Sequence, residues 1–142
     1  MEREEKEMKS ELSEKNPYWI DKHRFYELQH FCLQYPIWEK SYAMLDGLSW
    51  RQLDLATYGK TNDISNPTEK VAIKKSFYLN RMELITETAK KVDAGIAPYL
   101  IRGVTEGLSY DVMNAKKKIP CCRETYYDMY RKFFWLLNEE RG

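Results

Sequence analysis

The feature that most constrains the fold is a run of apolar side chains at helical spacing near the end of the chain. Tyr126, Tyr130, Phe133 and Leu137 follow one another at intervals of four, three and four residues, which places them on one face of a helix. The spacing predicts a helix from about Cys122 to Asn138. The neighbours that widen its apolar face are Met129, Phe134 and Leu136.

A shorter helix is predicted just before it, with a tight corner between the two. Gly107 is placed to end a preceding helix in the left-handed conformation, and Ser109 to cap the short helix. Ile119 offers an apolar plug, and Pro120 stops helical continuation through the corner. The residues expected on the inward side of the short helix are Val112, Met113 and Ala115. Two helices that meet at such a corner are typical of a helix-turn-helix.

The upstream chain also has helical patterns. Asp21 is a cap candidate for a helix carrying Phe25, Leu28 and Cys32 on one side, and a second short helix ends at Asp46-Gly47. The inner side of that second helix is expected to hold Ile37, Trp38, Tyr42 and Leu45.

A long helix is predicted from Pro67 to about Val92, because proline suits the first helical position. Its apolar stripe indicates a packing seam, which serves either as internal core or as a homodimer coiled coil. The stripe residues are Val71, Tyr78, Met82, Ile85, Ala89 and Val92. Pro98 then opens a scaffold helix that braces the terminal pair.

These patterns predict an all-α fold, a helical bundle with a C-terminal helix-turn-helix, in three parts. Residues 1–16 form a mobile charged arm with four basic and six acidic groups. Residues 17–94 form an N-terminal helical region with a loop at about 48–66. Residues 95–142 form the helix-turn-helix domain, with eight basic and six acidic groups.

Composition excludes several classes of protein. The chain of 142 residues is 43% hydrophobic and 32% charged, which fits a globular protein. No apolar run approaches the roughly 18–20 residues that span a bilayer, and residues 1–16 are too acidic for a signal peptide. Three cysteines, two of them adjacent, make no disulfide framework, so we expect a reducing cytoplasm.

Metal, cofactor and enzyme signatures are absent from the sequence. His23, His30 and Cys32 share one helix without ligand spacing, and Cys121-Cys122 are adjacent instead of two to four residues apart. We therefore expect no metal site, no cofactor and no catalysis. The two adjacent cysteines are interpreted as turn residues, with redox sensing as the alternative.

The residues Leu108-Ser109-Tyr110, then Ile119, Thr125 and the aromatic stripe resemble the region-4 helix-turn-helix of bacterial sigma factors. The order of Tyr35-Pro36, the helix at 71–92 and the terminal unit is similar to the ArpU/RinA type of phage transcriptional regulators, over roughly residues 25 to 140. Two departures are visible: the corner is one or two residues longer than usual, and Glu124 and Asp128 add negative charge.

The resemblance implies a phage or prophage transcriptional regulator, an activator of late genes that acts in the cytoplasm of a bacterial host. Its partners would be double-stranded promoter DNA and host RNA polymerase. The residues expected to face bases are Arg123, Thr125 and Tyr127. Those expected to meet phosphates are Arg131, Lys132, Lys116, Lys117 and Lys118, with Ser109 and Tyr110 touching the backbone.

Two other functions fit the same pattern. In a protein-binding adaptor, the terminal unit serves as a scaffold, and Tyr127, Trp135 and the acidic arm engage RNA polymerase or another phage protein. A DNA-recognition subunit of a packaging motor is also helical, although such proteins usually carry the DNA-binding unit at the N-terminus.

Overall fold

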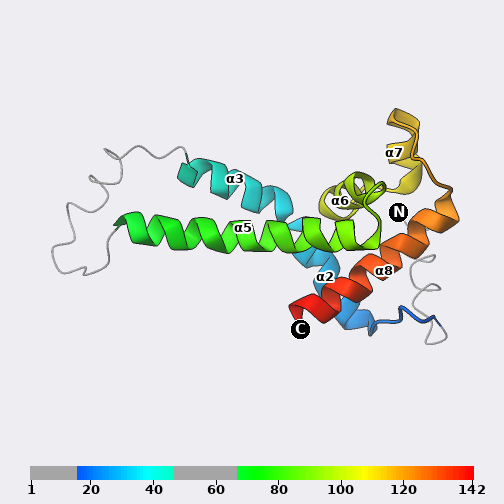
Figure 1. The fold of residues 1–142 in the computed structure, drawn as a ribbon, viewed down its shortest axis with the longest axis horizontal. Coiled ribbons are helices and arrows are strands. Elements are labelled where there is room, and N and C mark those ends of the chain that lie inside the picture. The colour runs from blue at the N-terminus through cyan, green and yellow to red at the C-terminus, as the bar shows by residue number, and fades with distance from the viewer. Residues whose placement is uncertain (1–15, 47–66) are drawn as a thin grey trace. The chain divides into compact units, whose positions relative to one another are not determined.

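The computed structural model describes residues 16–46 and 67–142, and helices are the only regular elements in these two ranges (Figure 1). The prediction of an all-α fold is confirmed for the described residues. The helices are α2 (Lys22–Leu33), α3 (Tyr35–Asp46), α5 (Pro67–Val92), α6 (Ala97–Glu106), α7 (Tyr110–Lys116) and α8 (Arg123–Arg141). None of these helices combines the length and the apolar content that crossing a bilayer requires. The predicted arm and the loop at about 48–66 lie outside the described residues, apart from Asn16.

The described residues divide into two compact units. Unit 1 joins residues 16–34 with residues 84–142, and unit 2 comprises residues 35–46 and 67–83. This division differs from the predicted boundary between residues 94 and 95, because α2 and the last turns of α5 belong with the C-terminal helices.

Local capping signals set the ends of the helices as the sequence predicts. The Asp21 carboxylate accepts a hydrogen bond from the His23 N–H at 3.0 Å, at the start of α2. Gly107 ends α6 with a φ of 68°, a left-handed conformation that glycine adopts without a steric penalty. The Ser109 hydroxyl accepts from the Val112 N–H at 3.3 Å and caps α7.

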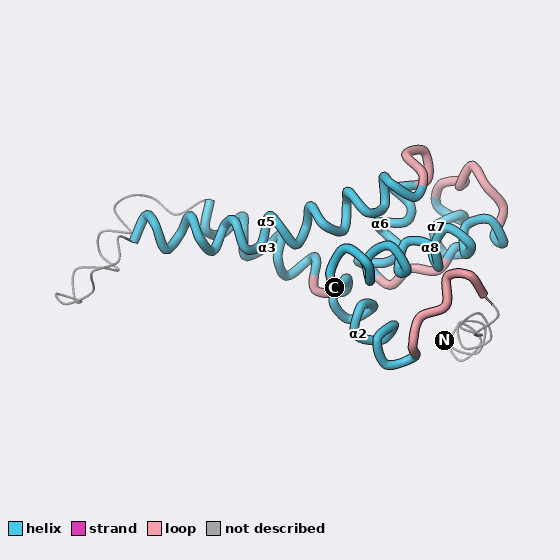
Figure 2. The backbone as a smooth tube through the Cα atoms, turned by 60° about the horizontal axis from the view of Figure 1, so that its bottom comes forward, coloured by secondary structure: helices cyan, strands magenta, loops and turns pink. Residues whose placement is uncertain are grey.

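The core of unit 1 is built around α8, which packs against α2, α6 and α7 (Figures 1 and 2). The predicted stripe is confirmed, since Tyr126, Tyr130, Phe133 and Leu137 are all buried. Phe134 is buried as well, and its ring centroid lies 5.0 Å from that of Phe25 on α2. The other core side chains of this unit include Leu28, Ile85, Ala89, Leu100, Val104, Met113 and Ile119.

Two expectations about inward-facing residues are wrong. Val112 is 46% exposed and Ala115 is also exposed, so Met113 alone carries the buried side of α7. A helix of seven residues makes only about two turns, which leaves few positions that can reach a neighbour. Met129 and Leu136 are half-buried and lie at the edge of the α8 face.

In unit 2, α3 and the first part of α5 lie side by side and run in opposite directions (Figure 1). The Lys75 ammonium joins them, because it lies 2.6 Å from the Asp46 carboxylate and 5.3 Å from the centroid of the Tyr42 ring. Trp38 is buried as predicted, whereas Ile37 is 63% exposed and the expectation that it faces inward is wrong.

Candidate nucleic-acid interface

The first two turns of α8 carry exposed side chains beside the corner. The contacts of helix α2 with the second half of α8 include the following two. Phe25 packs against Phe134, and the Arg24 guanidinium donates a hydrogen bond to the Asn138 side chain at 2.7 Å. Glu124 and Asp128, which belong to the first two turns, are exposed. These two contacts with α2 therefore support the far half of α8, and within the described residues the side chains of Arg123, Glu124 and Asp128 near its start are exposed.

Two side chains of α7 hold the chain that leads into α8. The Tyr110 hydroxyl donates a hydrogen bond to the Cys121 carbonyl at 2.6 Å. The Asn114 side-chain oxygen accepts from the Ile119 N–H at 2.9 Å, and Ile119 is buried as the predicted plug. These bonds hold the corner to one short helix at two points, Ile119 and Cys121.

The connection between α7 and α8 is six residues long, from 117 to 122. A helix-turn-helix usually has a turn of about three to four residues, so the corner is longer than the typical one, in line with the departure noted in the sequence. Lys116 ends α7, while Lys117 and Lys118 lie past the helix on the connection, where Lys117 is extended. All three lysines are exposed.

Arg123 begins α8 next to this cationic run. Its side chain is exposed, and its guanidinium carbon lies 5.7 Å from the centroid of the Tyr127 ring. A cation at that distance from an aromatic ring is attracted by it, which limits the directions that the arginine samples. The three lysines and Arg123 are thus four exposed basic side chains at the junction of α7 and α8, where the acidic Glu124 is exposed as well.

The structure gives two tyrosines roles other than those expected. Tyr127 is half-buried, and its hydroxyl accepts a hydrogen bond from the Tyr110 N–H at 3.3 Å, so it bridges α8 to α7 instead of standing outward. Both the N–H and the hydroxyl of Tyr110 donate hydrogen bonds within the protein, so neither is left to bind a phosphate.

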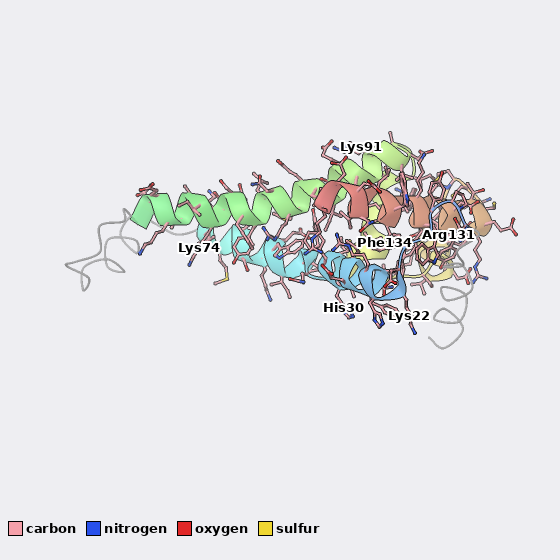
Figure 3. The ribbon with its side chains drawn as sticks, turned by 90° about the horizontal axis from the view of Figure 1, so that it is seen from below. Lys22, His30, Lys74, Lys91, Arg131 and Phe134 are labelled. Atoms are coloured by element: carbon pink, nitrogen blue, oxygen red, sulfur yellow. The ribbon has the colours of Figure 1, made fainter. Side chains whose placement is uncertain are left out.

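Arg131 is also less available than expected. Its side chain, labelled in Figure 3, is 15% exposed. Its guanidinium forms an ion pair with Asp128, three residues earlier on α8. Because oppositely charged residues three apart on a helix are neighbours, this ion pair could have been predicted from the sequence. Lys132 is half-buried at the edge of the helix.

The remaining predicted residues support the corner. The Ser109 hydroxyl is occupied as the cap of α7, and the Thr125 hydroxyl lies 3.1 Å from the Cys122 sulfur. This hydrogen bond lowers the pKa of the exposed Cys122 thiol, whereas burial raises the pKa of the neighbouring Cys121 thiol.

Two residues that shape this surface are not identified by the sequence analysis. One is Asn114, although a short polar side chain near a helix end often bonds nearby backbone. The other is Gly103, which lies inside α6 where the Tyr126 hydroxyl comes so close that a Cβ built on the glycine would overlap this oxygen. An isolated glycine within a helical pattern is the signal that could have found it.

No protein-family model matches the chain, and neither a curated protein nor a solved structure does. Among the described residues, no group of three or more His, Cys, Asp or Glu side chains is placed to hold a metal ion. The assignment of a function therefore depends on the geometry and charge of the surface itself.

Proposed function

We propose that this protein binds double-stranded DNA through the junction of α7 and α8. The observation that carries the proposal is the set of four exposed basic side chains, Lys116, Lys117, Lys118 and Arg123, at the corner that leads into α8. Exposed lysines on a short connection suit phosphates, because they gain from displacing condensed counterions. An arginine at the first position of a helix suits a base edge in the major groove.

The resemblance to ArpU/RinA-type regulators supports a more specific role as a phage or prophage transcriptional regulator, which we propose activates late genes. In this role the α7–α8 pair acts as a sigma-like helix-turn-helix, and host RNA polymerase supplies part of the binding energy. Glu124 and Asp128 place negative charge near the four basic residues, and Asp128 pairs with Arg131. We therefore expect a moderate intrinsic affinity for DNA.

Within this proposal, the DNA-contacting residues are fewer than the resemblance alone implies. We assign Lys116, Lys117 and Lys118 as the phosphate contacts and Arg123 as the base reader. The residues assigned to support are Ser109, Tyr110, Thr125, Tyr127 and Arg131, since their polar groups bind within the protein.

The test is a salt titration of binding to the DNA upstream of the protein's own coding region and to random DNA. We expect Lys117→Ala to weaken binding to both DNAs alike and to reduce the slope of log K against log salt by about one. We expect Arg123→Ala to reduce the preference for the specific DNA by roughly 5- to 150-fold, the value of one good base contact of about 1–3 kcal/mol.

Lys90→Ala is the matched control, because it removes the same charge from an exposed position in the last turn of α5. Equal weakening by Lys90→Ala and Lys117→Ala would mean that only the net charge matters. A wild-type protein that shows no salt-sensitive binding to either DNA would contradict the proposal and favour the protein-binding adaptor.

A further inference from the structure

We infer that one side of α5 is a second nucleic-acid contact, which binds backbone phosphates without regard to sequence. The surface is the basic stripe, formed by Lys70, Lys74 and Arg81 in the part of α5 that belongs to unit 2. The inference rests on the proposed function for its choice of ligand, although it concerns residues other than those at the corner.

The helical register gathers these three cations on one side of α5. At 3.6 residues per turn, they project from the helix within about 40° of one another. The two acidic residues in this part of α5, Glu69 and Glu83, project about 120–160° from the middle of the stripe. Lys70 and Lys74 are exposed and Arg81 is half-exposed. The charges of the helix are therefore separated by side.

The basic stripe has no acidic neighbours along the helix. None of its residues has an aspartate or glutamate three or four positions away, where an ion pair forms on a helix. Lys74, labelled in Figure 3, forms no hydrogen bond or ion pair with the residues that the structure describes. Each of the lysines of α5 outside the stripe does form an ion pair. These pairs are Lys75–Asp46 at 2.6 Å, Lys90–Glu87 at 3.5 Å and Lys91–Glu140 at 2.6 Å.

The spacing along the stripe suits a run of phosphates. Lys70 and Lys74 are one turn apart on the same side, where like charges repel each other and destabilise a helix. A bound anion relieves this repulsion, and lysines that neutralise phosphates also gain from the release of condensed counterions. From Lys70 to Arg81 the stripe is roughly 16 Å long, which is about five phosphate steps along one DNA strand.

The Arg81 guanidinium is held in place by Phe77. Its carbon lies 3.4 Å from the centroid of the Phe77 ring, and its Nη1 donates a hydrogen bond to the Phe77 carbonyl at 3.4 Å. This bond uses one of the five N–H donors of the side chain, so others remain for a phosphate, whose geometry the planar group matches. Because the side chain is already ordered, less conformational entropy is lost when it binds.

The apolar side chains beside the stripe are too few for a lipid surface to be the better occupant. A helix that lies on a membrane buries a whole apolar face among the lipids. Phe77 is 46% exposed, but its ring carries the Arg81 guanidinium and packs against the Tyr78 ring at a centroid distance of 5.4 Å. Ile73 is exposed at the margin of the stripe. Lysine is also depleted at protein interfaces, so charge complementarity favours a nucleic acid.

Fluorescence anisotropy of labelled duplex DNA with the full chain, titrated with salt, tests the inference. We expect Lys74→Ala and Arg81→Gln each to lower the affinity roughly 5- to 10-fold near 0.1 M salt, because each removes one phosphate contact. Each should also reduce the slope of log K against log salt by about one. The losses should be equal on random DNA and on the DNA upstream of the coding region, since phosphates carry no sequence information.

The matched control moves the charge to a different side of the same helix. Ser76 is exposed and projects about 140° from the middle of the stripe. The double variant Lys74→Ala/Ser76→Lys has the net charge of the wild type, but we expect it to bind as weakly as Lys74→Ala. Recovery of the affinity in the double variant would overturn the assignment to the stripe. Far-UV circular dichroism of each variant shows whether the helices are retained.

The failure of this inference can be distinguished from the failure of the proposed function. If Lys117→Ala weakens DNA binding and neither stripe variant does, the inference is overturned and the corner stands. If the stripe variants weaken binding and Lys117→Ala does not, the inference holds and the corner is the wrong site. A chain that ignores DNA but binds phosphatidylglycerol vesicles through Lys74 would overturn the inference in favour of a lipid surface.

Discussion

The close approach of Tyr126 to Gly103 leads to a prediction in which one substitution changes sign with its background. Tyr126 is fully buried, and its hydroxyl finds no hydrogen-bond partner among the described residues. Burial raises the pKa of this hydroxyl, in keeping with an apolar setting. The ring cannot move aside easily, because it packs against Tyr110 and Tyr127 at centroid distances of 5.6 and 5.1 Å.

The magnitude follows from two opposed effects of Gly103→Ala. Alanine inside a helix is favoured over glycine by about 1 kcal/mol. Its methyl would overlap the Tyr126 oxygen, whereas carbon and oxygen normally touch at about 3.3–3.6 Å. Overpacking of this kind costs about 1–3 kcal/mol, so the single variant should be destabilised by up to about 2 kcal/mol.

The Tyr126→Phe background removes the oxygen and should reverse this result. The single change Tyr126→Phe is expected to be neutral or stabilising by about 1 kcal/mol, since it deletes a buried polar group that lacks a partner. Gly103→Ala should then stabilise by about 1 kcal/mol, since the next neighbour of the new methyl, the Met113 Cε, is 3.4 Å away.

Urea unfolding of the wild type, both single variants and the double variant, followed by circular dichroism, measures the coupling. We expect a coupling of about 1–3 kcal/mol. Tyr130→Phe is the control on the same face of α8, and its effect should add to that of Gly103→Ala. If Gly103→Ala has the same effect in the wild-type background and in the Tyr126→Phe background, the close approach does not exist in solution.

Two further predictions concern the three cysteines and the corner between α7 and α8. The thiols should react with a disulfide reagent in the order Cys122, Cys121, Cys32, with the rate of Cys122 rising at a lower pH than that of Cys121. The hydrogen bond from Thr125 lowers the pKa of the Cys122 thiol, whereas burial raises the pKa of the Cys121 thiol. Cys32 is buried, which should block its reaction until the chain unfolds. Equal rates for the three thiols would contradict this order. Tyr110→Phe removes the hydrogen bond to the Cys121 carbonyl and should cost about 1 kcal/mol of unfolding free energy, whereas an unchanged urea midpoint would show that the bond contributes nothing.

Much of the local structure was predictable because its causes lie within a few residues. Gly107 and Ser109 act on their own helix ends, and the four-three-four spacing beginning at Tyr126 determines which side of α8 is buried. The start of α5 at Pro67 follows from the same kind of signal.

What the sequence could not show depends on contacts between distant segments. Nothing near Phe25 indicates that it meets Phe134, and this contact places α2 with the C-terminal helices. The exposure of Val112 follows from how little of α7 its neighbours cover. The candidate surface was predicted only in part for the same reason. The exposure of its lysines follows from local chain geometry. The hydrogen bond that Tyr127 accepts from Tyr110, by contrast, joins two helices and could not be predicted without the fold.

The hydrogen bond that Tyr110 donates and the one that Asn114 accepts have a consequence for how this protein can vary. They hold the connection between α7 and α8 at Cys121 and Ile119, which are not the exposed lysine positions. Lys117 and Lys118 can therefore be exchanged for other residues without refolding the corner. Such a layout allows the charge of this surface to change while the scaffold stays constant.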